Sequence, residues 1–150
     1  YSDWAEKAQS YKTELLRLVD EDTNAFTKIM DAFGLPKSSN EEKAIRKNAI
    51  IEATKGATMV PYSVMETAYQ SMEVMLEMAK TGLPASISDA GVGAMCARTA
   101  ILGAGLNVMI NVKDLDAPEF VSEIIEKANQ LEVKAERLEA EIMELVHSKL

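Results

Sequence analysis

Three carboxylates crowd one turn of an amphipathic stretch near the start of the chain, in the run Asp20-Glu21-Asp22. The apolar residues around this run recur at helical spacing: Trp4, Ala8, Tyr11, Leu15, Leu18, Ala25, Ile29 and Phe33. If the stretch is one helix, Asp22 lies one heptad after Leu15 and one before Ile29, so the pattern predicts that its side chain is buried. Burying an unpaired carboxylate costs free energy, so a buried Asp22 would be either a functional group or a bridge to a neighbouring helix. A third interpretation is that Asp22 lies at the edge of the stripe. Its position alone leaves these interpretations open.

Few other residue types are available for catalysis. The only histidine is His147, close to the C-terminus, and the only cysteine is Cys96. A zinc site or a nucleophile paired with histidine is therefore not expected, and no Gly-rich phosphate loop occurs. Any chemistry must come from carboxylates, amides, hydroxyls, lysine or arginine.

A second group of polar residues lies on the nearly uncharged, Gly- and Ala-rich segment 86–114. Asp89 and Asn107 are five helical turns apart and point the same way, and Asn111 falls near the same stripe. Two interpretations stay open: the stripe is a binding wall, or the asparagines satisfy neighbouring backbone groups. Arg98 interrupts the segment and would be costly within a membrane, so we expect a helix buried on most sides in a bundle.

Capping and breaking residues divide the chain into helices that position these groups. The first is expected from Ser2 or Asp3 to Phe33, before Gly34 and Pro36. The second begins at Ser39 or Asn40, must kink or break at Pro61, and ends at Gly82. Capping boxes are expected to open the third helix at Ser86 and the last at Asp116. Heptads from Val121 to Leu145 give the last helix a packing role.

The sequence predicts one all-α domain over residues 1–150, a bundle of long antiparallel helices with a Pro-kinked second helix and a buried third helix.

Composition narrows the possible partners and compartment. The formal net charge of -8 and the pI near 4.7 argue against nucleic acid as a partner. The single cysteine is typical of a cytosolic protein, and no signal segment opens the chain. The sequence begins without Met and inside the apolar pattern, so we expect it to start within a longer natural sequence.

Several motifs, in order, resemble the formimidoyltetrahydrofolate cyclodeaminase family, which includes the C-terminal domain of formiminotransferase-cyclodeaminases and the methenyltetrahydrofolate cyclohydrolases. The motifs are Leu18-Val19-Asp20-Glu21-Asp22-Thr23-Asn24-Ala25-Phe26, Gly34-Leu35-Pro36-Lys37, Val60-Pro61, Ser86-Ile87-Ser88-Asp89-Ala90-Gly91-Val92-Gly93-Ala94 and Asn107-Val108-Met109-Ile110-Asn111-Val112-Lys113-Asp114. They cover most of the chain up to Asp114, and the last helix matches only in character. The family begins with a helix that carries a Gly-Gly-Gly-Ser-like start, which is missing from this sequence.

The resemblance implies an all-α, dimer-forming cytoplasmic enzyme that converts 5-formimidoyltetrahydrofolate to 5,10-methenyltetrahydrofolate and releases ammonia. The family's essential aspartate corresponds to Asp22, which would act as acid and base. Asn107 and Asn111 would bind the pterin or the formimidoyl nitrogen, with Ser88 and Asp89 on the same wall and Lys113 at the glutamate tail. No metal or cofactor beyond the folate substrate is expected, and neither a nucleic acid nor a membrane. Partners implied are a polyglutamylated folate, a second copy of the chain, and a formiminotransferase.

Two alternatives remain. A cyclohydrolase of the same family would add water to the methenyl product, and the residues named above do not separate the two reactions. A non-catalytic helical interaction module would rely on the heptads of the last helix. That module predicts that Asp22, Asn107 and Asn111 are dispersed, whereas an enzyme predicts that at least two of them line one pocket.

Overall fold

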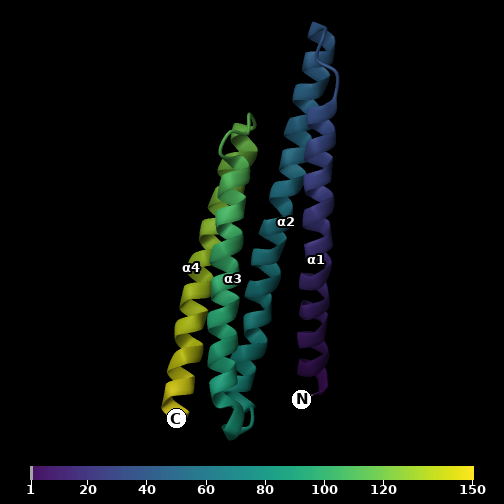
Figure 1. Ribbon diagram of the computed structural model, residues 1–150. Coiled ribbons are helices and arrows are strands. Elements are labelled where there is room, and N and C mark those ends of the chain that lie inside the picture. The colour runs from purple at the N-terminus through teal and green to yellow at the C-terminus, as the bar shows by residue number, and fades with distance from the viewer. Residues whose placement is uncertain (1) are drawn as a thin grey trace.

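The computed structural model describes residues 2–150, and this part of the chain contains long α-helices and no strand. The helices are α1 (Ser2–Gly34), α2 (Asn40–Thr81), α3 (Ile87–Val112) and α4 (Pro118–Lys149), with a short 3-10 helix η1 (Pro84–Ser86) before α3. They run alternately up and down side by side, with α1 at one edge next to α2 and both chain ends at the same end of the bundle (Figure 1). The predicted all-α bundle is confirmed.

The predicted side-chain cap is present at the start of α2 and absent at the starts of α3 and α4. Ser39 and Glu42 form a reciprocal capping box at the start of α2, each side chain accepting a hydrogen bond of 3.1 Å from the other's backbone N–H. The boxes predicted at Ser86 and Asp116 are wrong, because neither α3 nor α4 has a side-chain hydrogen bond at its N-cap. Asp116 instead forms an ion pair of 2.5 Å with Lys47 of α2.

Pro61 lies inside α2, which continues through it as one helix of 42 residues. Of the two outcomes predicted at Pro61, a kink or a break, the continuous helix excludes the break, and the kink stays a prediction. Proline has no backbone N–H, so it cannot donate to the carbonyl four residues earlier, at Ala57. That carbonyl needs another partner, which comes from α3 as described below.

The core lies between α2, α3 and α4, which pack against one another. The side chains excluded from water are mostly aliphatic and include Met65, Met72, Ala94, Ile101, Val108, Ala135 and Ile142. Arg98 of α3 reaches Glu139 of α4 at 2.9 Å, so the one charged side chain between Ala90 and Val112 is paired inside the bundle. The heptads of α4 pack into this core, as predicted.

The first helix is attached differently, because it packs chiefly against α2. Only Leu18 and Ala32 of α1 are buried. Near its start, the hydroxyl of Tyr11 and the ammonium of Lys7 both donate to Glu73 of α2, the latter at 2.7 Å. Burial and the hydrogen bond to Glu73 raise the pKa of Tyr11 to about 12.

The third helix buries one face and exposes the other, so the prediction that it is buried on most sides is wrong. Large apolar side chains on its outer face are exposed: Val92, Met95, Leu102, Leu106, Met109 and Ile110. By length and composition alone, residues 84–112 could cross a membrane, with a third of the most apolar window buried. The packing of its inner face and the paired Arg98 are features of a core helix in a bundle.

Candidate functional site

Asp22 and Asn107 come from different helices and line one groove. Asp22 belongs to α1, Asn107 to α3, and Pro61 of α2 also lines the groove, whose volume is about 470 Å³. The remaining lining residues are mostly apolar or small: Leu15, Leu18, Val19, Thr23, Val60, Val64, Ala100, Gly103 and Ala104. A largely apolar groove with one carboxylate and one amide can hold a flat ring, orient it and transfer a proton.

The carboxylate of Asp22 is exposed in the single chain, so the prediction of its burial is wrong. Leu18, one turn earlier, is only 3% exposed, and Ile29, one heptad later, is half-buried. Because α1 packs chiefly on α2, the part of its apolar stripe around Asp22 is not covered by a core. This part of the stripe lines the groove. Asp22 forms no ion pair with any residue in 2–150 and is therefore available to a ligand.

The two asparagines of α3 differ in what their amides contact. Asn107 is exposed, and its side-chain amide forms no hydrogen bond within the described part of the chain. Asn111, one turn later, is half-buried, and its Nδ2 donates to the carbonyl of Ala57 at 3.3 Å. Ala57 is the residue whose carbonyl Pro61 leaves without a helical donor. This bond gives Asn111 a structural role, and its contact with substrate stays a prediction.

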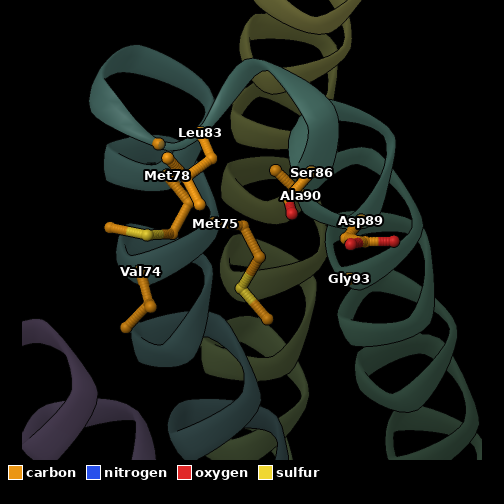
Figure 2. Close-up of a pocket in the computed structure, with 9 residues that line it drawn as sticks. Val74, Met75, Met78, Leu83, Ser86, Asp89, Ala90 and Gly93 are labelled. Carbon is orange, nitrogen blue, oxygen red and sulfur yellow. The ribbon is translucent and has the colours of Figure 1, made fainter.

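Asp89 lines a separate hollow at the other end of α3. That hollow lies beside the turn between α2 and α3 and has a volume of about 510 Å³ (Figure 2). Its other lining residues are mostly apolar: Val74, Met75, Met78, Gly82, Leu83, Ser86, Ala90 and Gly93. Asn107 follows Asp89 by 18 positions, so the two are about 27 Å apart along the helix axis. The structure therefore does not bring Asp89 into the groove of Asp22.

The last two predicted site residues are exposed and line neither space. Ser88 precedes Asp89 at the start of α3, and Lys113 is the C-cap of the same helix. Of the predicted residues, only Asp22 and Asn107 thus share one groove, and the binding roles of Ser88, Asp89 and Lys113 stay predictions.

A cluster of basic residues that the sequence analysis did not single out lines a third hollow, next to the groove. Its cations are Lys37, Lys43, Arg46 and Lys47, and Asn111 is part of its wall. The sequence holds a signal for it, because residues 43, 46 and 47 have the spacing of one helical face. The signal is weak, since charged residues at this spacing usually form a solvated face.

Within residues 2–150, no group of three or more His, Cys, Asp or Glu side chains is arranged to hold a metal ion. The groove residues offer one carboxylate and one amide, which suit an organic ligand better than a cation. The prediction that no cofactor is needed stays a prediction.

Comparison with known proteins identifies the class to which this fold and groove belong. Residues 1–130 match the formiminotransferase-cyclodeaminase family. The chain is 36% identical over 145 residues to the methenyltetrahydrofolate cyclohydrolase of Methylorubrum extorquens, covering 97% of this chain and 70% of that protein. The chain thus belongs to the folate cyclodeaminase and cyclohydrolase family of one-carbon metabolism, as the motifs predicted.

Further relatives carry the cyclodeaminase name. The chain is 36% identical over 107 residues to the formimidoyltransferase-cyclodeaminase of Mus musculus and 33% identical over 136 residues to that of Gallus gallus. These matches cover 71% and 91% of this chain but only 20% and 25% of those longer proteins. A crystal structure of formiminotetrahydrofolate cyclodeaminase from Thermotoga maritima superposes with a TM-score of 0.79 at 23% identity, over 93% of this chain and 66% of that one. It supports the same fold.

Proposed function

We propose that the chain catalyses a reaction at the carbon that joins N5 and N10 of tetrahydrofolate, with Asp22 as the acid and base. The observation that carries this proposal is the shared groove of Asp22 and Asn107 in a member of this family. A non-catalytic interaction module predicts that these residues are dispersed, so the shared groove favours the enzyme. Asn107, whose amide is free within residues 2–150, would hold the pterin or the reacting nitrogen.

The cyclodeaminase reaction is the first candidate. N10 of 5-formimidoyltetrahydrofolate attacks the formimidoyl carbon on N5 and loses its proton. The formimidoyl nitrogen gains protons and leaves as ammonia, which gives 5,10-methenyltetrahydrofolate. One carboxylate can take the first proton and deliver the second, and a positioned group of this kind contributes roughly 10²- to 10⁴-fold in rate. Five of the relatives found are formimidoyltransferase-cyclodeaminases, which supports this order of candidates.

A cyclohydrolase is the second candidate, and a specific observation favours it. The match to the Methylorubrum extorquens cyclohydrolase spans nearly the whole chain and most of that protein, whereas the matches to the bifunctional enzymes span a quarter of them or less. In this reaction water attacks the same bridging carbon, and Asp22 would remove one proton from the water. The bond between that carbon and N5 then breaks and the remaining hydroxyl proton passes to N5, which leaves a formyl group on N10. Both reactions thus require one base beside one carbon, so the groove serves either.

The apolar faces left open by the bundle support a second copy of the chain as a partner. Exposed apolar side chains occur on both α1 and α3, among them Leu16, Phe26, Leu102 and Leu106. Faces of this kind on a soluble protein usually mark an interface. The working unit is then a homodimer or higher homo-oligomer in the cytoplasm, supplied by a formiminotransferase if the substrate is the formimidoyl form. Sedimentation of the wild type and of Leu106→Glu tests this: loss of the dimer in the variant supports it, and a monomeric wild type contradicts it.

Two assays on the wild-type protein test the reaction. Release of ammonia from 5-formimidoyltetrahydrofolate identifies the cyclodeaminase. Consumption of 5,10-methenyltetrahydrofolate without ammonia release identifies the cyclohydrolase. If a well-folded protein is silent in both assays, the enzymatic proposal is wrong and the interaction module is the better explanation.

A further inference from the structure

The two helices that carry Asp22 and Asn107 are both held by α2. Asp22 lies on α1, which packs chiefly against α2, and Asn107 lies on α3, which packs against α2 and α4 (Figure 1). Pro61 of α2 lines the same groove as both residues. The distance from the carboxylate of Asp22 to the amide of Asn107 therefore depends on how α3 is placed along the axis of α2.

The apolar contact between α2 and α3 fixes this placement only loosely. Most of the buried residues of α3 are alanine or glycine, and the buried side chains of α2 that face the core include Met65 and Met72. Small side chains form shallow ridges, and methionine adapts to irregular gaps. Packed helices with such surfaces tolerate a small sliding of one along the other.

A directional contact between the two helices lies next to the groove. Nδ2 of Asn111 donates to the carbonyl of Ala57 at 3.3 Å, whereas no ion pair joins α2 to α3 within residues 2–150. The hydroxyl of Thr58 already donates to the carbonyl of Thr54 at 2.8 Å. Ala57 is only 6% exposed, so its carbonyl has little access to water and depends on the amide of Asn111.

This hydrogen bond lies one helical turn from the groove on both helices. Pro61 follows Ala57 by four residues and Asn107 precedes Asn111 by four, a distance of about 6 Å along each axis. Because α2 and α3 are antiparallel, both steps lead in the same direction, into the groove. Proline has no N–H to donate, so the residue that lines the groove also leaves the carbonyl of Ala57 open to Asn111.

We propose that Asn111 is a positioning residue, which fixes α3 along α2 through the carbonyl of Ala57 and so holds Asn107 opposite Asp22. Asn111 acts through Asn107 and not by contact with the substrate. This inference rests on the proposed function, because its effect is on the rate of that reaction. Misplacement of a reacting group by about 1 Å can lower a rate by roughly 10²-fold.

A double-mutant cycle on turnover tests whether Asn111 acts through Asn107. The reaction that the wild type catalyses, ammonia release or methenyl hydrolysis, is measured for Asn107→Ala, Asn111→Ala and the double variant. We expect Asn111→Ala to lower kcat/KM by roughly 10- to 10²-fold in the wild-type background but by less than about 2-fold in the Asn107→Ala background. Equal losses in both backgrounds would show that Asn111 acts independently of Asn107, as a substrate contact does, and would overturn the inference.

A second cycle separates positioning from mere satisfaction of the carbonyl. Pro61→Ala supplies the carbonyl of Ala57 with a backbone N–H in place of the amide. In the Pro61→Ala background, Asn111→Ala should therefore lower the urea midpoint of unfolding less than it does in the wild type, while kcat/KM still falls by roughly 10-fold or more. Recovery of both the midpoint and kcat/KM would show that Asn111 only satisfies the carbonyl, and would overturn the inference.

A matched control accounts for the loss of stability itself. Ser39→Ala removes the side chain that caps the start of α2, outside the groove, and should lower the urea midpoint about as much as Asn111→Ala. Its kcat/KM should stay near the wild type, and a fall as large as that of Asn111→Ala would overturn the inference. If the wild type turns over neither substrate, the proposed function and the inference are both overturned, whereas the outcomes named above overturn the inference alone.

Discussion

The two outer helices α1 and α4 are nearly equal in length, at 33 and 32 residues, and both are charged and amphipathic, yet the bundle uses them differently. α4 packs against both α2 and α3 and buries six residues, whereas α1 packs chiefly against α2 and buries two. Two glycines of α3 show that the side of α3 facing α4 is closely packed, whereas the side facing the groove is open. A Cβ at Gly91 would lie 3.3 Å from Met143 of α4, but a Cβ at Gly103, which lines the groove, would meet nothing within 4 Å.

The comparison separates architecture from function. α4 closes the core and offers no predicted site residue. α1 leaves space beside α3, and that space holds Asp22 and Asn107. An amphipathic stripe therefore has two possible uses: it fills a core where a second neighbour is present, and it lines a binding groove where that neighbour is absent.

The largest effect on stability is expected in α4. Leu131 is 8% exposed and packs in the core, so Leu131→Ala removes buried methyl groups and leaves a cavity. We expect a loss of about 2–5 kcal/mol in the free energy of unfolding, measured by urea denaturation. A loss below about 1 kcal/mol would show that α4 is not closely packed against the core.

An intermediate effect is expected where Asn111 of α3 contacts α2 one turn before Pro61. Asn111→Ala leaves the carbonyl of Ala57 without a donor and should cost about 1 kcal/mol of unfolding free energy. Pro61→Ala restores a backbone N–H that can donate to this carbonyl. The cost of Asn111→Ala should therefore shrink in a Pro61→Ala background, and an undiminished cost in that double-mutant cycle would contradict the compensating role.

A smaller, pH-dependent effect is expected at the anchor of α1. Burial raises the pKa of Glu73, but the hydrogen bonds from Lys7 and Tyr11 outweigh it and lower the pKa below its ordinary value. A lowered pKa gives stability that is present above about pH 4.5 and lost as the pH falls through the folded-state pKa.

The stability difference between the wild type and Glu73→Gln, which is no more than about 1 kcal/mol because the pair is partly exposed, should therefore diminish in acid. Unfolding at pH 7 and pH 3 measures it, with Glu144→Gln as an exposed control on α4. Equal differences at both pH values would contradict the assignment.

The smallest effect is expected from the matched leucine of α1. Leu16 is 60% exposed, so Leu16→Ala should change the free energy of unfolding of the single chain by no more than about 0.5 kcal/mol. Comparison with Leu131→Ala under the same conditions and at low protein concentration sharpens the contrast between the two helices. A large loss at Leu16 would show that its face is already covered in the single chain.

The sequence predicted the helices well because their ends depend on local chemistry. Ser39, Gly82 and Pro118 act within one or two turns of themselves, and the helices begin or end near them in the structure. Asp22 could also be singled out, because a carboxylate on an apolar stripe is visible in the spacing alone. The family motifs added Asn107, which lines the same groove.

The depth of each site residue could not be predicted, because periodicity identifies an apolar face without showing what covers it. Asp22 and the outer face of α3 were therefore expected to be buried and are exposed. The hydrogen-bond partner of Asn111 could not be predicted for a related reason. The acceptor, the carbonyl of Ala57, lies 54 residues away, and it lacks a helical donor only because of a proline in another helix. The cluster of basic residues left only a weak signal, because residues 43, 46 and 47 share one helical face while other parts of the wall of their hollow come from other helices and loops.

The central claim is that the open side of α1 carries the chemistry through Asp22. The most direct test compares Asp22→Asn with Asp20→Asn, an exposed carboxylate two residues earlier that does not line the groove. Ammonia release and methenyl hydrolysis are measured for both variants, together with their free energies of unfolding. The account predicts that Asp22→Asn lowers kcat/KM by roughly 10²- to 10⁴-fold at unchanged stability, while Asp20→Asn stays near the wild type. An Asp22→Asn protein that turns over substrate at the wild-type rate would contradict it.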